Sequence, residues 1–200
     1  ALLGQIYSSQ GDTEQAIKNL RKAVELKPDD QGLNSLLMLE LSQNGDIDAT
    51  IESWKLLLKI NPNYAEGYLN LGNTLADNGN LDETIDCYKK ALKIKPDYAD
   101  AYFNMGNALN DKGELDAAID SYKQALKINP DYAEAYNNMA YALKKQAKME
   151  EAIEAYNKAL TIKPDVAEVY NNMGLALVDY GQMEEAIEAY NKALAIIPNY

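Results

Sequence analysis

The sequence contains no histidine and only one cysteine, Cys87, among its 200 residues. Histidine is the usual general base at neutral pH, and zinc centres are built from clustered His and Cys side chains. Their absence excludes zinc sites, Cys–His dyads and Ser–His–Asp triads, and no cofactor-binding motif is present. A single cysteine also excludes a disulfide bond within the chain, which favours an intracellular, cytoplasmic location.

Positive charge is also scarce. The chain has 19 Lys and Arg residues against 31 Asp and Glu residues, which gives a net charge of −12. Such a surface repels the phosphates of nucleic acids and of anionic lipids. The sequence contains no run of about 18 apolar residues, the length that a membrane-spanning helix needs. We therefore expect no nucleic acid and no membrane as partners, although the 47% hydrophobic content predicts a buried core.

A repeat of 34 residues organises the whole sequence. All six prolines obey this spacing: Pro28, Pro62, Pro96, Pro130, Pro164 and Pro198. A constant period of this length indicates a repeat architecture rather than separate globular domains. We therefore predict one array over residues 1–200. It consists of a partial repeat, 1–30, and five full repeats, 31–64, 65–98, 99–132, 133–166 and 167–200.

Each repeat has the apolar spacing of two helices. Tyr102, Met105, Gly106 and Leu109 lie at i, i+3, i+4 and i+7, which is one buried helical stripe. A second stripe of this kind runs from Met183 to Ile197. A glycine between the two stripes can end the first helix in a left-handed conformation. The repeat 133–166 has Ala147 at this place, and we expect a cost on the order of 1 kcal/mol there.

This pattern resembles the tetratricopeptide repeat, a helix–turn–helix unit of 34 residues. The matching residues in one repeat are Tyr102, Met105, Gly106, Leu109, Ala118, Tyr122, Ala125 and Pro130. The resemblance implies an all-α fold, a right-handed superhelical solenoid of antiparallel helix pairs whose first helices line a concave groove. The repeat 31–64 departs most, with Asn34, Met38, Thr50 and Trp54 at signature positions. The uncovered repeats at both ends indicate an excised segment of a longer protein.

Asparagines recur on the predicted groove face. Asn70, Asn104, Asn138 and Asn172 share one repeat position, and this ladder resembles that of O-linked N-acetylglucosamine transferases. An Asn amide offers a donor and an acceptor to the backbone of an extended peptide. The alternative is a solvated polar face copied by duplication. The predicted peptide-binding residues are Asn70, Asn104, Asn138, Asn172, Asn73, Asn107, Asp77, Asp111, Phe103 and Tyr141.

The chemistry of the groove sets its predicted ligand. Its acidic residues favour a neutral or basic peptide. They are Glu66, Asp77, Asp100, Asp111, Glu134, Glu168 and Asp179. Phe103 and Tyr141 either anchor such a peptide or fill a gap between first helices.

We consider three functions for this sequence. The first is a protein–protein interaction module that binds an extended peptide, as a free-standing adaptor or as the substrate-recruiting arm of a larger enzyme. The alternative is a self-association element that forms homo-oligomers through uncapped repeat ends. The third, catalysis within the chain, has no nucleophile–base pair to support it. We therefore expect the segment itself not to be an enzyme.

Overall fold

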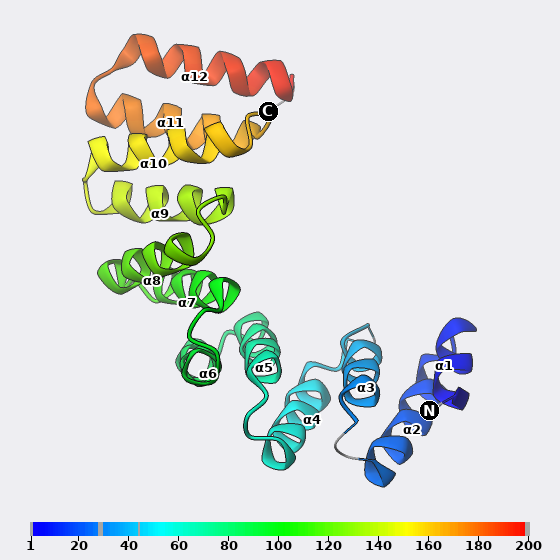
Figure 1. Cartoon of the computed structure of the whole chain (residues 1–200). Coiled ribbons are helices and arrows are strands. Elements are labelled where there is room, and N and C mark those ends of the chain that lie inside the picture. Colours follow the sequence, from blue (N-terminus) through cyan, green and yellow to red (C-terminus); the bar gives the residue numbers. More distant parts are fainter. Residues whose placement is uncertain (1, 28–29, 44, 199–200) are drawn as a thin grey trace. The chain divides into compact units, whose positions relative to one another are not determined.

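The computed structural model describes residues 2–27, 30–43 and 45–198, which contain twelve helices and no strand. The helices come in pairs, one pair for each predicted repeat, and short turns join the two members of a pair (Figure 1). The chain divides into two compact units, residues 1–96 and residues 97–200. The all-α prediction is confirmed, whereas the single array over 1–200 stays a prediction.

Unit 1 is a stack of three helix pairs in which each helix contacts the next along the chain. Its helices are α1 (Leu2–Ser9), α2 (Thr13–Leu26), α3 (Gln31–Gln43), α4 (Ile47–Ile60), α5 (Ala65–Asp77) and α6 (Leu81–Ile94). The side chains of Asp12 and Asp46 cap α2 and α4 by accepting from the third backbone N–H beyond them. Leu37, Met38 and Trp54 lie in the core of this stack.

Unit 2 contains three full repeats. Its helices are α7 (Ala99–Asp111), α8 (Leu115–Ile128), α9 (Ala133–Lys145), α10 (Met149–Ile162), α11 (Ala167–Tyr180) and α12 (Met183–Ile196). The first helix of the middle repeat, α9, contacts both α7 and α11, whereas no comparable contact joins the second helices α8 and α10 within the described residues. The first helices therefore approach each other more closely than the second helices do, and they form one continuous face of unit 2.

The turns between paired helices have the predicted left-handed residue. Gly113 has φ = +83° and Gly181 has φ = +87°. Ala147 takes the same place with φ = +59°, as the sequence predicted. An alanine in this region has an unfavourable steric contact of its Cβ atom, which glycine does not have. The repeat 133–166 therefore contains a strained turn.

In three repeats a tyrosine of the second helix packs on a glycine of the first. A Cβ atom added at Gly106 would lie 2.5 Å from Cε1 of Tyr122, and Gly72 and Gly174 have the same relation to Tyr88 and Tyr190. Because such a distance is far below van der Waals contact, the missing side chain permits this ring to pack against the first helix. The glycines are thus structural, which agrees with the helix pairing inferred from the sequence.

Candidate peptide-binding face

The first helices of unit 2 present asparagines at equivalent points. Asn104 lies on α7, Asn138 on α9 and Asn172 on α11, and all three side chains are half-buried. Since α9 contacts both of its neighbours, these three residues belong to one face. We call this surface of α7, α9 and α11 the first-helix face.

The structure brings Asn107 and Asn138 together. The amide nitrogen of Asn138 donates to Oδ1 of Asn107 at 2.9 Å, and the Tyr122 hydroxyl donates to the same oxygen at 2.8 Å. Asn137 in turn donates to Oδ1 of Asn138 at 3.1 Å. The Asn138 amide is therefore hydrogen-bonded within the protein rather than open to solvent. This bond also joins two consecutive repeats across α7 and α9.

Tyr122 is a residue of this site that the sequence indicated only as part of the repeat signature. Its side chain is 1% exposed, and burial followed by the nearby carboxylate of Asp111 raises the pKa of its hydroxyl. The hydroxyl stays protonated at neutral pH and so remains a donor to Asn107. The signal available in the sequence was an Asn followed 15 residues later by a Tyr, since Asn73 and Tyr88 repeat the pair.

The remaining asparagines of the prediction lie on α5 in unit 1. The Tyr88 hydroxyl donates to Oδ1 of Asn73 at 2.8 Å, which reproduces the contact between Tyr122 and Asn107. Asn70 is half-buried and Asp77 is exposed on the same helix. Burial, with Asp77 as a second cause, raises the pKa of Tyr88. Of the four ladder asparagines, unit 1 therefore carries only Asn70, because α3 has Leu36 at this repeat position.

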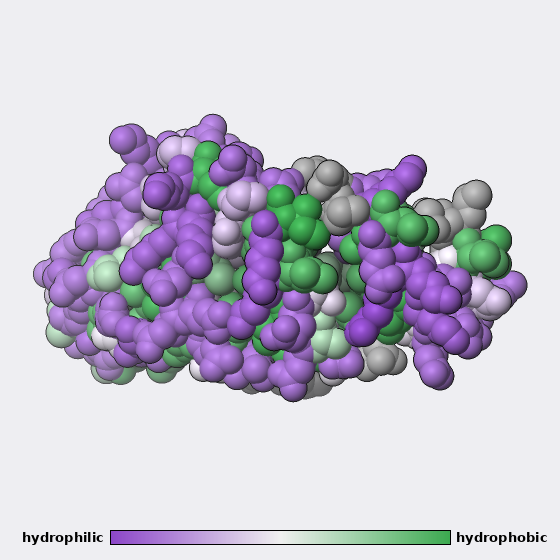
Figure 2. All heavy atoms as spheres, turned by 90° about the horizontal axis from the view of Figure 1, so that it is seen from below, coloured by the Kyte–Doolittle hydropathy of each residue, from purple (hydrophilic) through white to green (hydrophobic). Residues whose placement is uncertain are grey.

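Several of the predicted groove acids have partners. Asp100 accepts a hydrogen bond from the Tyr132 hydroxyl at 3.2 Å, and Asp179 forms an ion pair with Lys144 at 3.4 Å. Glu134 is paired with Lys163, and the hydrogen bond from Lys163 lowers the pKa of this carboxyl group. Asp111 is exposed. Figure 2, which views the molecule from below relative to Figure 1, shows a mostly hydrophilic surface with a few apolar patches. Part of the negative charge is thus compensated locally.

The two aromatic candidates have different surroundings. The half-buried Phe103 ring lies 4.8 Å from the ring centroid of Tyr132 and 6.1 Å from that of Tyr122. Tyr141 is 41% exposed, and the Lys145 ammonium lies 4.7 Å from the centre of its ring. Phe103 therefore packs among aromatic rings of the repeat stack. Tyr141 presents its ring to solvent at the repeat position that Asn107 holds one repeat earlier.

The replacement of an asparagine by Tyr141 has a consequence inside its repeat. Tyr156 corresponds to Tyr122, and its hydroxyl is buried without a hydrogen-bond partner among the described residues. The side chain is fully buried, with a relative exposure of 0%. Burial raises the pKa of this hydroxyl, so the phenol is neutral. The repeat 133–166 therefore lacks the hydrogen bond that the tyrosine hydroxyl donates to an asparagine in the repeat 99–132.

Other reactive groups are few in the part of the chain that the structure describes. No group of three His, Cys, Asp or Glu side chains there has a geometry suited to a metal ion. Burial is the main cause that raises the pKa of the Cys87 thiol to about 11, so the sulfur is protonated at neutral pH. None of the described helices has both the length and the apolar composition to span a bilayer.

Comparisons with known proteins agree with this architecture. Models described as "TPR repeat" match residues 39–79, 72–110 and 106–147, and models described as "Tetratricopeptide repeat" match residues 1–30 and 131–199. A comparison with curated protein sequences gives no match.

Solved structures share the fold. A crystal structure of MamA is 34% identical, with 78% of this chain and 92% of MamA covered and a TM-score of 0.76. YrrB, described as a TPR protein with an unusual peptide-binding site, is 21% identical, with coverage of 90% and 93% and a TM-score of 0.75. PilF of Pseudomonas aeruginosa is 19% identical, with coverage of 100% and 90% and a TM-score of 0.78. Paired helices, the 34-residue period and these matches lead to one conclusion: the chain belongs to the tetratricopeptide repeat family, whose helical repeats serve as scaffolds for protein–protein interaction.

Proposed function

We propose that the first-helix face of unit 2 binds an extended, neutral or basic peptide segment of a partner protein. Asn104, Asn138 and Asn172 contact the peptide backbone, and the side chains beside them select its sequence. The observation that carries this proposal is the direct contact of α9 with both α7 and α11, which makes one face of three helices with an equivalent asparagine on each.

The spacing of this face suits an extended chain. Helices that pack together lie about 8–10 Å apart, and an extended peptide advances roughly 3.3 Å per residue. One asparagine can then meet about every third peptide residue. The Asn138 amide exchanges its bond to Asn107 for a bond to the peptide, and such an exchange changes the free energy by only about 1 kcal/mol. That YrrB is described as binding a peptide shows the ability in one protein of this fold.

The test uses peptides selected from a random library on the wild-type chain. The triple variant Asn104→Ala, Asn138→Ala and Asn172→Ala should bind these peptides at least about tenfold more weakly in isothermal titration calorimetry, because about 1 kcal/mol is lost for each backbone bond. The matched control replaces the exposed Asn157 and Asn191 of the second helices by Ala and should bind like the wild type. Equal affinity of the triple variant, with unchanged circular dichroism, would contradict the proposal.

A second candidate function is self-association through α12. Three apolar side chains of this helix are exposed, Met183 54%, Ile187 55% and Leu194 45%, and so is that of the following residue, Ile197 45%. Two residues equivalent to Ile187 and Leu194 in inner repeats are buried, Ile119 at 4% and Leu160 at 8% exposed. Light scattering over a concentration series tests this function. Dimers that disappear in the variant Ile187→Lys support it, and a monomer at every concentration excludes it.

A further inference from the structure

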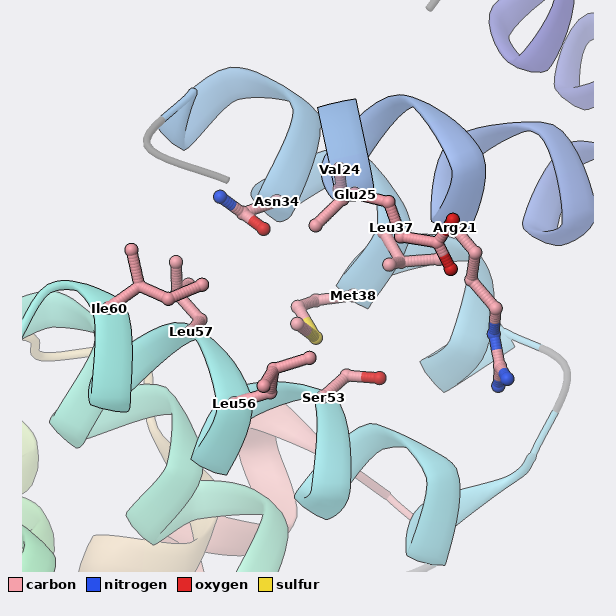
Figure 3. A pocket seen from close by; sticks show the side chains of 10 residues that line it. All are labelled: Arg21, Val24, Glu25, Asn34, Leu37, Met38, Ser53, Leu56, Leu57 and Ile60. Carbon is pink, nitrogen blue, oxygen red and sulfur yellow. The ribbon is translucent and has the colours of Figure 1, made fainter. Parts of the chain in front are cut away.

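Unit 1 contains a cavity of about 420 Å³ between α2, α3 and α4 (Figure 3). Val24 of α2, Met38 of α3, and Leu57 and Ile60 of α4 supply most of the apolar wall that the close-up shows. This volume is within the range of ligand-binding pockets, about 300–1,000 Å³. The cavity therefore has room for a group as large as an aromatic side chain.

The cause of the cavity is the side chain of Asn34. The other four full repeats have a tyrosine at this position: Tyr68, Tyr102, Tyr136 and Tyr170. The Asn34 amide nitrogen instead donates to the backbone carbonyl of Asp30 at 3.0 Å, so this short side chain turns back along its own chain. It lines the cavity but is too short to fill it. The space that a tyrosine ring takes in the other repeats is left unfilled.

The rim of the cavity differs from that of the other repeats as well. Leu56 stands where the other full repeats have polar residues, Lys90, Gln124, Lys158 and Lys192. Its side chain is 56% exposed, and Ile60 beside the cavity is 40% exposed. The repeat 31–64 has thus lost an aromatic ring inside and gained an exposed apolar side chain at the opening. Packing within unit 1 does not require Leu56 to be apolar, because most of its surface contacts only solvent.

A cation also lines the cavity. Arg21 of α2, the only arginine in the chain, is one of the lining residues, and its side chain lies at one side of the cavity (Figure 3). In two other repeats a lysine at the position of Leu56 lies over the tyrosine ring: Lys90 lies 5.7 Å from the ring centre of Tyr68, and Lys192 lies 5.7 Å from that of Tyr170. A guanidinium is attracted to an aromatic face in the same way. In the repeat 31–64 Leu56 replaces that lysine, and Arg21 of the preceding helix α2 is the cation that lines the cavity, with a charge complementary to an aromatic ring.

We propose that this cavity is a docking site for an aromatic side chain, phenylalanine or tyrosine, of a partner polypeptide. The incoming ring takes the place of the missing repeat tyrosine, packs on Leu57 and Met38, and lies against Leu56 and Arg21. A buried aromatic anchor of this kind dominates the affinity of many protein interfaces. The site lies in unit 1 and does not depend on the asparagines of the first-helix face.

The probes are p-cresol, which is the tyrosine side chain, and N-acetyl-tyrosine amide. Methyl-labelled full-length chain is titrated with each probe, and the methyl resonances of Val24, Met38, Leu56, Leu57 and Ile60 are followed. We expect saturable shifts confined to these methyl groups. The variant Asn34→Tyr, which restores the ring of the other repeats, should weaken p-cresol binding at least about tenfold and raise the melting temperature. Leu56→Lys should weaken binding without changing the fold.

The matched control is Lys158→Leu, which places an exposed leucine at the equivalent position beside an intact Tyr136. It should gain no p-cresol site. Absence of saturable shifts at the five methyl groups, or unchanged shifts in both Asn34→Tyr and Leu56→Lys, overturns the proposal. Equal affinity for cyclohexylmethanol overturns the preference for an aromatic ring. If the same shifts appear without probe as protein concentration rises, a second copy occupies the cavity and a separate partner is excluded.

Discussion

The consecutive repeats 99–132 and 133–166 share the same fold but differ at three structural positions. Gly106, Asn107 and Gly113 of the first repeat correspond to Ala140, Tyr141 and Ala147 of the second. In the first repeat the Tyr122 hydroxyl has an acceptor and the turn has a glycine. In the second the Tyr156 hydroxyl has no partner among the described residues, and the turn residue is an alanine at φ = +59°.

Neighbouring repeats therefore tolerate local defects while keeping the same helix pairing. In a repeat stack, stability is a sum of repeat and interface terms, so one weak repeat is supported by its neighbours. The polar contacts around Asn107 are then not required for the fold. They belong to the face on which we place the peptide, and each substitution below measures how far the two repeats differ.

The largest effect is expected for Gly106→Ala. The added Cβ atom would meet the Tyr122 ring, which is nearly fully buried, and must displace it from Asn107. We expect a loss of about 2–3 kcal/mol in the free energy of unfolding, measured by urea denaturation. The reverse change, Ala140→Gly, should cost no more than about 1 kcal/mol, the helix propensity of glycine. Equal losses in both variants would contradict the distinction between the repeats.

Asn107→Ala is expected to have the next largest effect. It removes the acceptor shared by Tyr122 and Asn138, so two donors lose their partner at once. We expect about 1–2 kcal/mol of destabilisation in the same denaturation experiment. Asn157→Ala on the exposed side of α10 serves as the control and should leave stability unchanged. A neutral Asn107→Ala variant would mean that these hydrogen bonds contribute nothing to stability.

Ala147→Gly should increase stability. Glycine adopts the left-handed conformation of this turn without the Cβ contact, and we expect a gain of about 1 kcal/mol in the free energy of unfolding. The opposite change, Gly113→Ala at φ = +83°, should lose a similar amount. A loss of stability in Ala147→Gly would show that the alanine turn is not strained.

The smallest effect is expected for Tyr156→Phe. Removal of a buried hydroxyl that has no partner leaves the ring packing intact, so we expect no loss and a gain of up to about 1 kcal/mol. Tyr122→Phe is the comparison, because it removes a donor with a partner and leaves Asn107 with one hydrogen bond fewer. Thermal unfolding of the two variants should shift in opposite directions. A similar decrease in both would indicate that Tyr156 has a partner in solution.

Much of the fold could be predicted from local sequence. The proline spacing and the apolar stripes gave the helix pairs, and the turn glycines marked where a left-handed residue is needed, including the unusual Ala147. These features depend on residues close in sequence, which is why they can be read without a structure. The division into units 1–96 and 97–200 has no such local signal.

The candidate site was harder to predict. The asparagine positions followed from the period, but the bond from Asn138 to Asn107 depends on side-chain conformations across two repeats. The aromatic surroundings of Phe103 also depend on two residues outside its own helix: Tyr122 lies on α8, and Tyr132 lies just before α9. The cavity beside Asn34 did have a signal, the loss of a repeat tyrosine. Whether such a loss is filled by neighbours or left open is decided by packing, which sequence alone does not give.

The most direct test of peptide binding at the first-helix face is to locate a library-selected peptide on the chain by nuclear magnetic resonance. The side-chain amide resonances of Asn104, Asn138 and Asn172 should shift on titration, whereas those of Asn157 and Asn191 on the second helices should stay in place. Asn107 should also shift, because Asn138 leaves it to bind the peptide. Shifts confined to the second helices would contradict the assignment of peptide binding to the first-helix face.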